Sequence, residues 1–316
     1  MDGDGEVEVE VEVMGDVEVD VDAHDEVVAR TRPGRRRTAD ERRALDAIEN
    51  WALRRAVNWT VLAGGTANVI MQLSMRPVAS GVMESPVVEG NLFTNPKRRA
   101  RTTMAYIAVT MLGDAEERAA MRRATNRSHA RVRSEPGSRV SYDAFDPALQ
   151  QWVAACLYRG AEDAYTAVFG PPEGAFRDEF YRQGMVFGTT LQLPPEMWPP
   201  TRDDFEVYWR ETLASLEMDD ETRDYLMRIV RLEYLDRRLP PGLLRWRNRM
   251  VAGHLPPEFR ELMRMPWSEA DQRAFDRSSR RLARLMHVLP RAAREWPIRR
   301  QLRDVQRRLA AGRPLF

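Results

Sequence analysis

Helix-start signals recur along most of this 316-residue chain, and each precedes a stretch in which apolar residues lie three and four positions apart. Asp114 is followed three residues later by Glu117, the spacing at which two side chains cap a helix N-terminus reciprocally. Asp146 precedes Pro147, and proline is favoured at the first helical position because its missing N–H is not needed there. The alternation typical of β-strands is rare after the first 37 residues. The pattern therefore predicts an all-α fold.

The predicted helices follow one another from residue 38 onward. Thr38 and Glu41 form a further capping-box pattern, so the ordered part of the chain is expected to begin there. No repeat of fixed period is visible, which argues against a solenoid and favours a single large helical bundle over 38–316. Prolines separate the later helices. The predicted helices are 96–113, 114–129, one that starts at 147, 173–188, 202–216, 221–235, 269–286 and 297–310.

The first 37 residues differ in composition from the rest. Residues 6–13 alternate Glu and Val, which taken alone is a strand pattern, but residues 1–26 hold twelve acidic side chains and no Lys or Arg. One valine face buries too little apolar surface to offset ordering entropy and repulsion among carboxylates. We therefore expect 1–37 to be a disordered tail, acidic at first and basic at its end, ahead of a helical domain over 38–316.

Charge and composition limit the partners that the helical part can have. The acidic tail leaves 36 acidic against 49 basic residues, and 48 of the 49 are arginine. Because this skew suits a GC-rich codon bias, we do not expect a nucleic-acid partner. No apolar run approaches the ~20 residues of a membrane span, and the acidic N-terminus lacks the pattern of a secretory signal. The single cysteine, Cys156, fits a reducing compartment, so a cytoplasmic location is expected.

Most standard catalytic patterns are absent. The chain has no nucleotide-binding glycine loop, no paired-cysteine metal motif and no nucleophile elbow. Its four histidines, at positions 24, 129, 254 and 287, lack the spacing of a multi-histidine metal site. A haem iron, however, needs only one neutral imidazole from the protein, since the porphyrin supplies four ligands. From chemistry alone, His129, His254 and His287 are equal candidates, and a histidine among arginines is most often a surface residue.

Several short motifs give these residues a family context. From about Trp59 to Leu216 their order and spacing resemble the catalytic domain of the oxygenase MpaB and latex-clearing protein (rubber oxygenase) family. The motifs that carry the resemblance are Pro77-Val78-Ala79-Ser80-Gly81-Val82, Arg98-Arg99-Ala100-Arg101-Thr102, His129-Ala130-Arg131-Val132-Arg133, Tyr142-Asp143-Ala144-Phe145-Asp146-Pro147, Trp152-Val153 and Leu193-Pro194-Pro195. Each is short, and their combined order is the specific signal.

The resemblance implies an all-helical fold with a globin-like core and additional helices, of which the C-terminal ones, over 220–316, lie beyond the matched region. It also implies a b-type haem whose iron activates dioxygen against an apolar substrate, such as an isoprenoid or another unsaturated hydrocarbon. Under this hypothesis the chain is an oxidoreductase, and its small-molecule partners are dioxygen and that substrate. Oligomeric state does not follow from the resemblance.

Four residues match the family's site. His129 corresponds to the axial histidine, and its other ring nitrogen is expected to find a hydrogen-bond acceptor. Arg98 and Thr102 correspond to a basic and a hydroxyl residue beside the haem, and their spacing of four places them on one helix face. A structural ion pair for Arg98 and a bond from Thr102 to its own helix are the alternatives. Arg101 stands where rubber oxygenases carry a lysine, and a guanidinium cannot deprotonate to ligate iron.

Two positions depart from the family pattern. The family often has a histidine where this chain has Arg76, and another where it has Ala154, so His129 is the only matching imidazole. A haem-dependent oxygenase is the leading hypothesis. The alternative is a helical family member without catalysis that acts as an interaction protein through its acidic tail and arginine-rich helices. Attachment of the basic C-terminal helices to a membrane surface is a third hypothesis.

Overall fold

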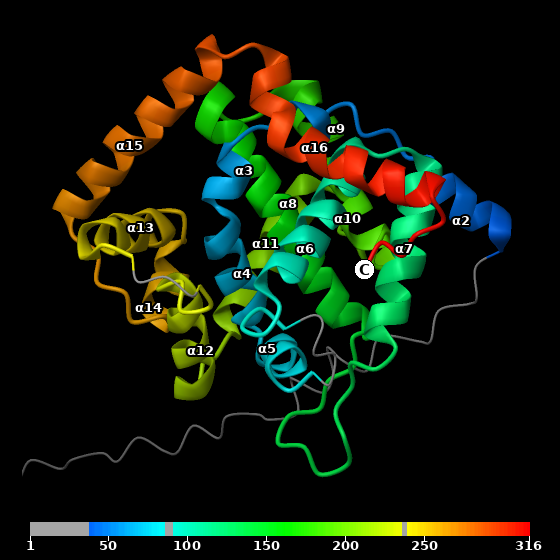
Figure 1. Cartoon of the computed structure of the whole chain (residues 1–316), viewed down its shortest axis with the longest axis horizontal. Coiled ribbons are helices and arrows are strands. Elements are labelled where there is room, and N and C mark those ends of the chain that lie inside the picture. Colours follow the sequence, from blue (N-terminus) through cyan, green and yellow to red (C-terminus); the bar gives the residue numbers. More distant parts are fainter. Residues whose placement is uncertain (1–37, 86–90, 236–238) are drawn as a thin grey trace, which may run out of the picture. The chain divides into compact units, whose positions relative to one another are not determined.

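The computed structural model describes residues 38–85, 91–235 and 239–316, and within them the chain forms helices and loops without a β-strand (Figure 1). The predicted all-α fold is thus confirmed. The acidic tail over 1–37, with its Glu/Val alternation, lies outside the described residues. The first half has α2 (Ala39–Asp46), η1 (Leu53–Ala56), α3 (Thr60–Ala63), α4 (Gly65–Leu73), α5 (Arg76–Met83), α6 (Pro96–Leu112), α7 (Ala115–His129) and α8 (Pro147–Phe169). The second half has α9 (Gly174–Gly184), α10 (Val186–Thr189), η3 (Pro195–Met197), α11 (Arg202–Ala214), α12 (Asp220–Val230), α13 (Pro241–Gly253), α14 (Pro257–Leu262), α15 (Glu269–Val288) and α16 (Arg291–Ala310).

The predicted helix starts are formed by the expected caps. At the start of α7, the Glu117 backbone N–H donates to the Asp114 carboxylate at 2.8 Å, and the Asp114 N–H donates back to Glu117 at 2.9 Å. Thr38 caps α2 in the same reciprocal way. At α8, the Asp146 carboxylate accepts from the backbone N–H of Ala148 at 2.8 Å. These side chains satisfy N–H groups that have no partner inside the helix, and so fix where each helix begins.

The last helix begins earlier than the sequence predicts. Pro297 is not its first residue; α16 starts at Arg291 and Pro297 lies inside it. A proline inside a helix removes one hydrogen bond, which leaves the carbonyl four residues earlier, that of Ala293, without its helical donor. The indole N–H of Trp59 donates to this carbonyl at 3.1 Å. A side chain far away in sequence thus replaces the missing bond, and this compensation is invisible to a local sequence rule.

Two other predicted helices have different ends. The segment predicted as one helix over 173–188 is divided at Met185 into α9 and α10. Gly184 ends α9 against the ring of Tyr158, and a Cβ at this glycine would lie 2.4 Å from that ring. The helix predicted over 221–235 ends at Val230, and Leu232 follows with a φ of 59°, a left-handed conformation that stops a helix.

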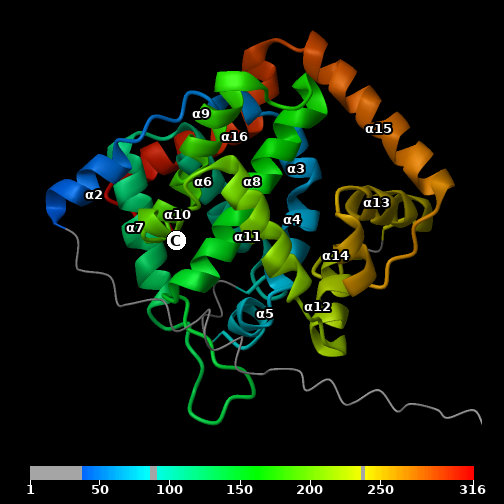
Figure 2. The ribbon, with the colours of Figure 1, turned by 180° about the vertical axis from the view of Figure 1, so that it is seen from behind.

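Helix α8 lies at the centre of the described part of the chain. It packs against α4, α10 and α15, and α16 packs along α6 (Figures 1 and 2). Trp152 and Tyr158 of α8 are fully buried, and the Trp152 indole N–H donates to the carbonyls of Met71 and Gln72 in α4. None of the described helices has the length and apolar character of a membrane span.

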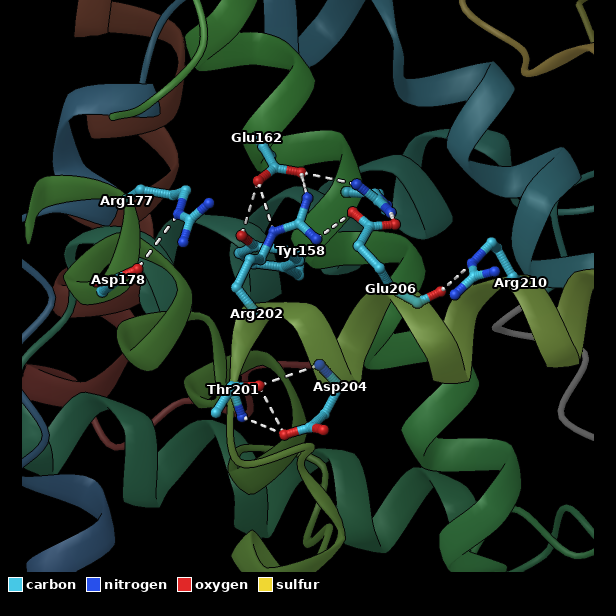
Figure 3. Close-up of polar contacts among 10 residues, drawn as sticks. Tyr158, Glu162, Arg177, Asp178, Thr201, Arg202, Asp204, Glu206 and Arg210 are labelled. Carbon is cyan, nitrogen blue, oxygen red and sulfur yellow. Dashed lines mark hydrogen bonds and ion pairs between the residues drawn. The ribbon is translucent and has the colours of Figure 1, made fainter. Parts of the chain in front are cut away.

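A buried ion network ties α8 to α11, which lie side by side (Figures 2 and 3). The Glu162 carboxylate accepts from Arg159 at 3.0 Å, from Arg202 at 2.8 and 3.1 Å, and from the Tyr158 hydroxyl at 2.9 Å. Both guanidinium groups also pair with Glu206. Every charge in the network therefore has an opposite charge and directed hydrogen bonds, the condition under which burial of ions is tolerated.

Replacement of Glu162 by Ala should destabilise the fold strongly. The change leaves two mostly buried guanidinium groups with Glu206 as their shared counterion, and loss of one partner of a buried pair typically costs about 3–5 kcal/mol. Urea unfolding followed by circular dichroism measures the difference. Glu211→Ala, at an exposed position of α11, is the matched control and should change stability by less than about 0.5 kcal/mol. Equal stabilities of the two variants would contradict a stabilising role of Glu162 in this ion network.

Candidate functional site

The start of α6 and the end of α7 lie at the same end of this helix pair. The two helices are joined by only Gly113 and Asp114 and pack against each other, so the chain reverses direction between them. Gly113 is required at this reversal because a Cβ there would lie 2.5 Å from the carbonyl oxygen of Val109. The reversal brings residues near 98–102 and residue 129, about 30 positions apart in sequence, to one region of the molecule.

A cavity of about 450 Å³ lies in this region. Its size falls within the range of roughly 300–1,000 Å³ that is typical of ligand pockets. Residues from α5, α6, α7, α8 and the loop after α7 line it. The apolar part of the lining includes Val78, Val82, Ile107, Val153 and Leu157. Five of the six motifs that carry the sequence resemblance thus contribute residues to one cavity.

The loop after α7 folds back to close one side of this cavity. The Ala144 N–H donates to the Val132 carbonyl at 2.9 Å, and the Ser134 N–H donates to the Tyr142 carbonyl at 2.8 Å. Tyr142 then lies against α5, where a Cβ on Gly81 would meet its ring at 3.3 Å. Two short motifs that are about 60 residues apart in sequence are therefore in contact beside the cavity.

His129, the last residue of α7, lines the cavity with its side chain largely enclosed by protein. Desolvation, together with the nearby positive charge of Arg99, lowers the pKa of its imidazole to about 4. The ring is therefore neutral at pH 7, which is the form that coordinates a metal. No group in the described part of the chain hydrogen-bonds this imidazole, so the expected acceptor for its second nitrogen is not found there.

Four arginines line the same cavity, Arg98 and Arg99 from α6, Arg127 from α7 and Arg131 from the loop. In the described part of the chain none of them forms an ion pair or donates a side-chain hydrogen bond. Burial lowers the pKa of Arg99, although its side chain is accessible from the cavity. Arginine heads without a counterion around an apolar cavity suit a ligand that is apolar with negatively charged edges.

The structure brings Arg98 and Thr102 to the cavity beside His129, as their spacing predicts. Arg98 has no structural ion pair in the described residues, which removes that alternative. Thr102 donates its hydroxyl to the Arg99 carbonyl of its own helix at 3.1 Å. Its oxygen still has lone pairs with which to accept a hydrogen bond, but its proton is used locally.

Arg101 does not line the His129 cavity. Its guanidinium points to the C-terminal segment and donates to the Leu315 carbonyl at 3.0 Å. Pro314 and Phe316 in that segment do line the cavity. A catalytic role for Arg101, which stands where rubber oxygenases carry a lysine, has no support in this geometry. The residue acts on the cavity through the segment that it holds.

Sequence reasoning missed four lining residues of α6. Arg99, Thr103, Tyr106 and Ile107 lie on the cavity side of the helix, although only Arg98 and Thr102 stand out in the motif. Tyr106 is buried and donates its hydroxyl to the Phe187 carbonyl at 2.5 Å. Residues 98, 99, 102, 103 and 106 follow the three- and four-residue spacing of one helix face. That spacing was the sequence signal from which these lining residues could have been predicted.

Neither position that departs from the family pattern belongs to the lining of this cavity. Arg76, at the start of α5, forms an exposed ion pair with Asp219 at 3.5 Å. Ala154 is fully buried in α8, and a Cβ on Gly188 would lie 3.4 Å from its methyl group. Loss of a histidine at either place therefore leaves the surroundings of His129 intact.

The other histidines are poorer metal ligands. His254 has its Nε2 enclosed in protein without a partner in the described chain, and its ring packs edge-on against Phe275. His287 is exposed on α15 and contacts Phe169. His24 lies outside the described residues. Among these residues no group of three His, Cys, Asp or Glu side chains is arranged to hold a metal ion, so any metal at His129 needs ligands from elsewhere.

Comparison with known proteins gives a family and two close relatives. The family model described as "ER-bound oxygenase mpaB/B'/Rubber oxygenase, catalytic domain" matches residues 51–291. "Uncharacterized protein Mb2261" of Mycobacterium bovis and "Uncharacterized protein Rv2237" of Mycobacterium tuberculosis are each 44% identical to this chain over 219 residues. That alignment covers 66% of this chain and 82% of each relative. No solved structure matches the chain.

Arg101→Ala should loosen the C-terminal segment at the cavity. A hydrogen bond from a charged donor contributes about 1.5–3 kcal/mol, so release of residues 311–316 should become roughly ten- to a hundredfold more frequent. Carboxypeptidase digestion followed by mass spectrometry measures this release. Arg303→Ala, at an exposed position of α16, is the control and should be trimmed at the wild-type rate. Equal trimming of both variants would show that Arg101 does not hold the segment.

Proposed function

Since the chain belongs to the family of the ER-bound oxygenase mpaB/B' and rubber oxygenase catalytic domains, we propose that it is a haem-dependent oxygenase that uses dioxygen to oxidise an apolar substrate. The family match supports oxygenase chemistry in general. Haem b as the cofactor, and an isoprenoid or another unsaturated hydrocarbon as the substrate, belong to the proposal.

One observation supports the haem assignment more than any other. His129 presents a neutral imidazole, without a hydrogen-bond partner in the described chain, to a cavity of about 450 Å³. A single histidine supplies one ligand to a metal ion, and a porphyrin supplies four more to its iron. The absence of a three-residue metal cluster in the described chain is therefore compatible with haem, whereas it argues against a site built from protein ligands alone.

The charged and apolar groups of the cavity also suit this cofactor. A b-type haem combines an apolar ring with two propionates, and the cavity combines aliphatic walls with four arginines that have no ion-pair partner in the described part of the chain. In this proposal His129 holds the iron, while Arg98, Arg99, Arg127 and Arg131 are the candidates for binding the propionates. When bound, the haem would supply the activation of dioxygen.

The protein's own contribution is positioning and exclusion of water. Val78, Val82, Ile107, Val153 and Leu157 present apolar surface on which a hydrocarbon displaces water at little cost. Phe316, held near the cavity with the C-terminal segment, adds an aromatic wall. Thr102 is left with an acceptor oxygen toward the cavity. We assign no proton transfer to Arg98 or Arg101, because guanidinium groups stay protonated at neutral pH.

The alternative of an interaction protein without catalysis predicts no cofactor. Its acidic tail lies outside the described residues, and the arginines of α15 and α16 are partly engaged with carboxylates of their own helices, such as Arg291 and Arg299 with Glu295. These pairs favour a structural role for part of that basic surface. They leave the His129 cavity unexplained, and for this reason we prefer the oxygenase.

Haem binding through His129 is tested by visible absorption. The full-length chain, produced in cells given a haem precursor, should show the strong Soret band of a histidine-ligated haem. His129→Ala should lose most of this band because the iron then lacks its protein ligand. His287→Ala, which removes an exposed histidine, should keep it. A Soret band of equal strength in both variants, or none in the unmodified chain, would contradict the proposal.

A further inference from the structure

A second cavity, of about 300 Å³, lies next to the His129 cavity. Residues of α4, α6, α8 and α12 line it. Arg99, Thr103 and Ile107 of α6 and Gln72 of α4 line both cavities, so the two spaces share this part of their walls. The second cavity has a mainly apolar lining, and its described lining includes neither His129 nor Arg98, Arg127 or Arg131.

Among the described residues that line this second cavity, Asp163 is the only carboxylate. It follows Glu162 directly, so the two side chains leave α8 about 100° apart around the helix. Glu162 faces α11 and is neutralised by Arg159 and Arg202 (Figure 3). Asp163 faces the cavity, and in the described part of the chain its carboxylate has no ion pair and accepts no hydrogen bond.

The surroundings of Asp163 disfavour its charge. Its side chain is exposed on the wall of the cavity, the neighbouring protein desolvates the carboxylate only in part, and Glu162 adds repulsion. Together they raise its pKa to about 6, so the group is mostly ionised at pH 7 but poorly compensated. An ionised carboxylate that accepts no hydrogen bond from the described chain is available to a ligand that carries a donor.

Two other polar groups of the lining, the side chains of Asn68 and His254, are less available. Asn68 donates to the Cys156 carbonyl at 2.5 Å and accepts from Gln72 at 2.7 Å. The Nε2 of His254 is enclosed in protein and cannot reach a ligand. The guanidinium of Arg99 also lines this cavity, and it interacts electrostatically with the hydroxyl of Tyr225. Asp163 and Arg99 are thus the two charged side chains that the described residues contribute to this cavity.

We propose that this second cavity binds the substrate, and that the substrate is an apolar molecule with a hydroxyl group that donates a hydrogen bond to Asp163. A carboxylate at the same place would be repelled by Asp163. An ammonium group would have to be desolvated in a cavity that also contains the guanidinium of Arg99. A neutral hydroxyl satisfies the carboxylate without burial of a second charge. The role of this molecule as the substrate rests on the proposed oxygenase function. The binding of such an alcohol in the cavity does not depend on that function.

The shared wall connects this inference to the His129 cavity. A molecule whose hydroxyl is held at Asp163 extends its hydrocarbon along Ile107 and Leu157, which line both spaces. Its far end is then directed toward the cavity that contains His129. The hydroxyl would therefore serve as an anchor remote from the position of oxidation, and the specificity of the enzyme would depend on the distance between the two.

Calorimetric titration of the purified full-length chain, without haem loading, tests the binding. The probes are 1-decanol, decylamine and decanoate, which share a chain length and differ in their head group. We expect 1-decanol to bind most tightly, and Asp163→Ala to weaken it about tenfold or more, because a hydrogen bond to a charged group is lost. Asp224→Asn, an exposed carboxylate on α12, is the control and should bind like the unmodified chain.

Asp163→Asn shows whether loss of binding comes from misfolding. Because the folded-state pKa of Asp163 lies above its unfolded value, its charge destabilises the fold as the pH rises through about 6. The Asn variant should therefore melt at a higher temperature than the unmodified chain at pH 8, with little difference at pH 4. The Asn side chain keeps an acceptor oxygen but carries no charge. The affinity of this variant for 1-decanol should therefore lie between those of the unmodified chain and Asp163→Ala.

Three results would overturn the inference. They are equal decanol affinity in the unmodified chain and Asp163→Ala, tighter binding of decanoate or decylamine than of decanol, and no decanol binding at all. Because the titration uses protein without haem, its outcome is independent of the Soret experiment. A chain that fails to bind haem but binds decanol through Asp163 would disprove the oxygenase and keep the alcohol site. A chain that binds haem through His129 but does not bind decanol would keep the proposed oxygenase and disprove the alcohol site.

Discussion

Desolvation of the His129 imidazole is the condition on which the candidate site depends. An exposed histidine would be partly protonated near neutral pH, and a protonated ring cannot bind a metal. Here the end of α7 is covered by α6 and by the returning loop, and Arg99 adds a positive charge, so the ring stays neutral. The same covering leaves a cavity open beside the ring, with arginines that have no counterion within the described chain. Neutral ligand, space and positive charge therefore arise from one arrangement of two helices and a loop.

Two adjacent carboxylates of helix α8, Glu162 and Asp163, lie on different faces of the helix and have different roles. On one side, Glu162 is bonded to two arginines and a tyrosine and joins α8 to α11 (Figure 3). On the other side, its neighbour Asp163 faces a cavity without a donor in the described residues. The carboxylate of Glu162 has all its partners within the protein and stabilises the fold. The carboxylate of Asp163 accepts no hydrogen bond from the described chain and is therefore available to a ligand. Adjacent residues of the same charge thus have opposite roles because the helix turns between them.

The sequence predicted the features that depend on neighbouring residues. The Asp114 and Glu117 cap and the start of α8 after Asp146 were predicted because their hydrogen bonds are local. The start of α16 was predicted wrongly, because the indole of Trp59 replaces the bond that Pro297 removes. The site was predicted in part through the family resemblance, which selected His129, Arg98 and Thr102. Arg99 and Asp163 could not be distinguished from their neighbours Arg98 and Glu162, because packing of distant helices decides which of two adjacent charges faces a cavity.

The central claim is a bond between the imidazole of His129 and a haem iron. A crystal structure of the haem-loaded full-length chain, with anomalous diffraction recorded at the iron absorption edge, tests it most directly. The account predicts a single iron peak in the cavity between α6 and α7, within bonding distance of a ring nitrogen of His129. An iron peak at His254, at His287 or at the protein surface would contradict it, and so would a peak in this cavity with the His129 ring turned away.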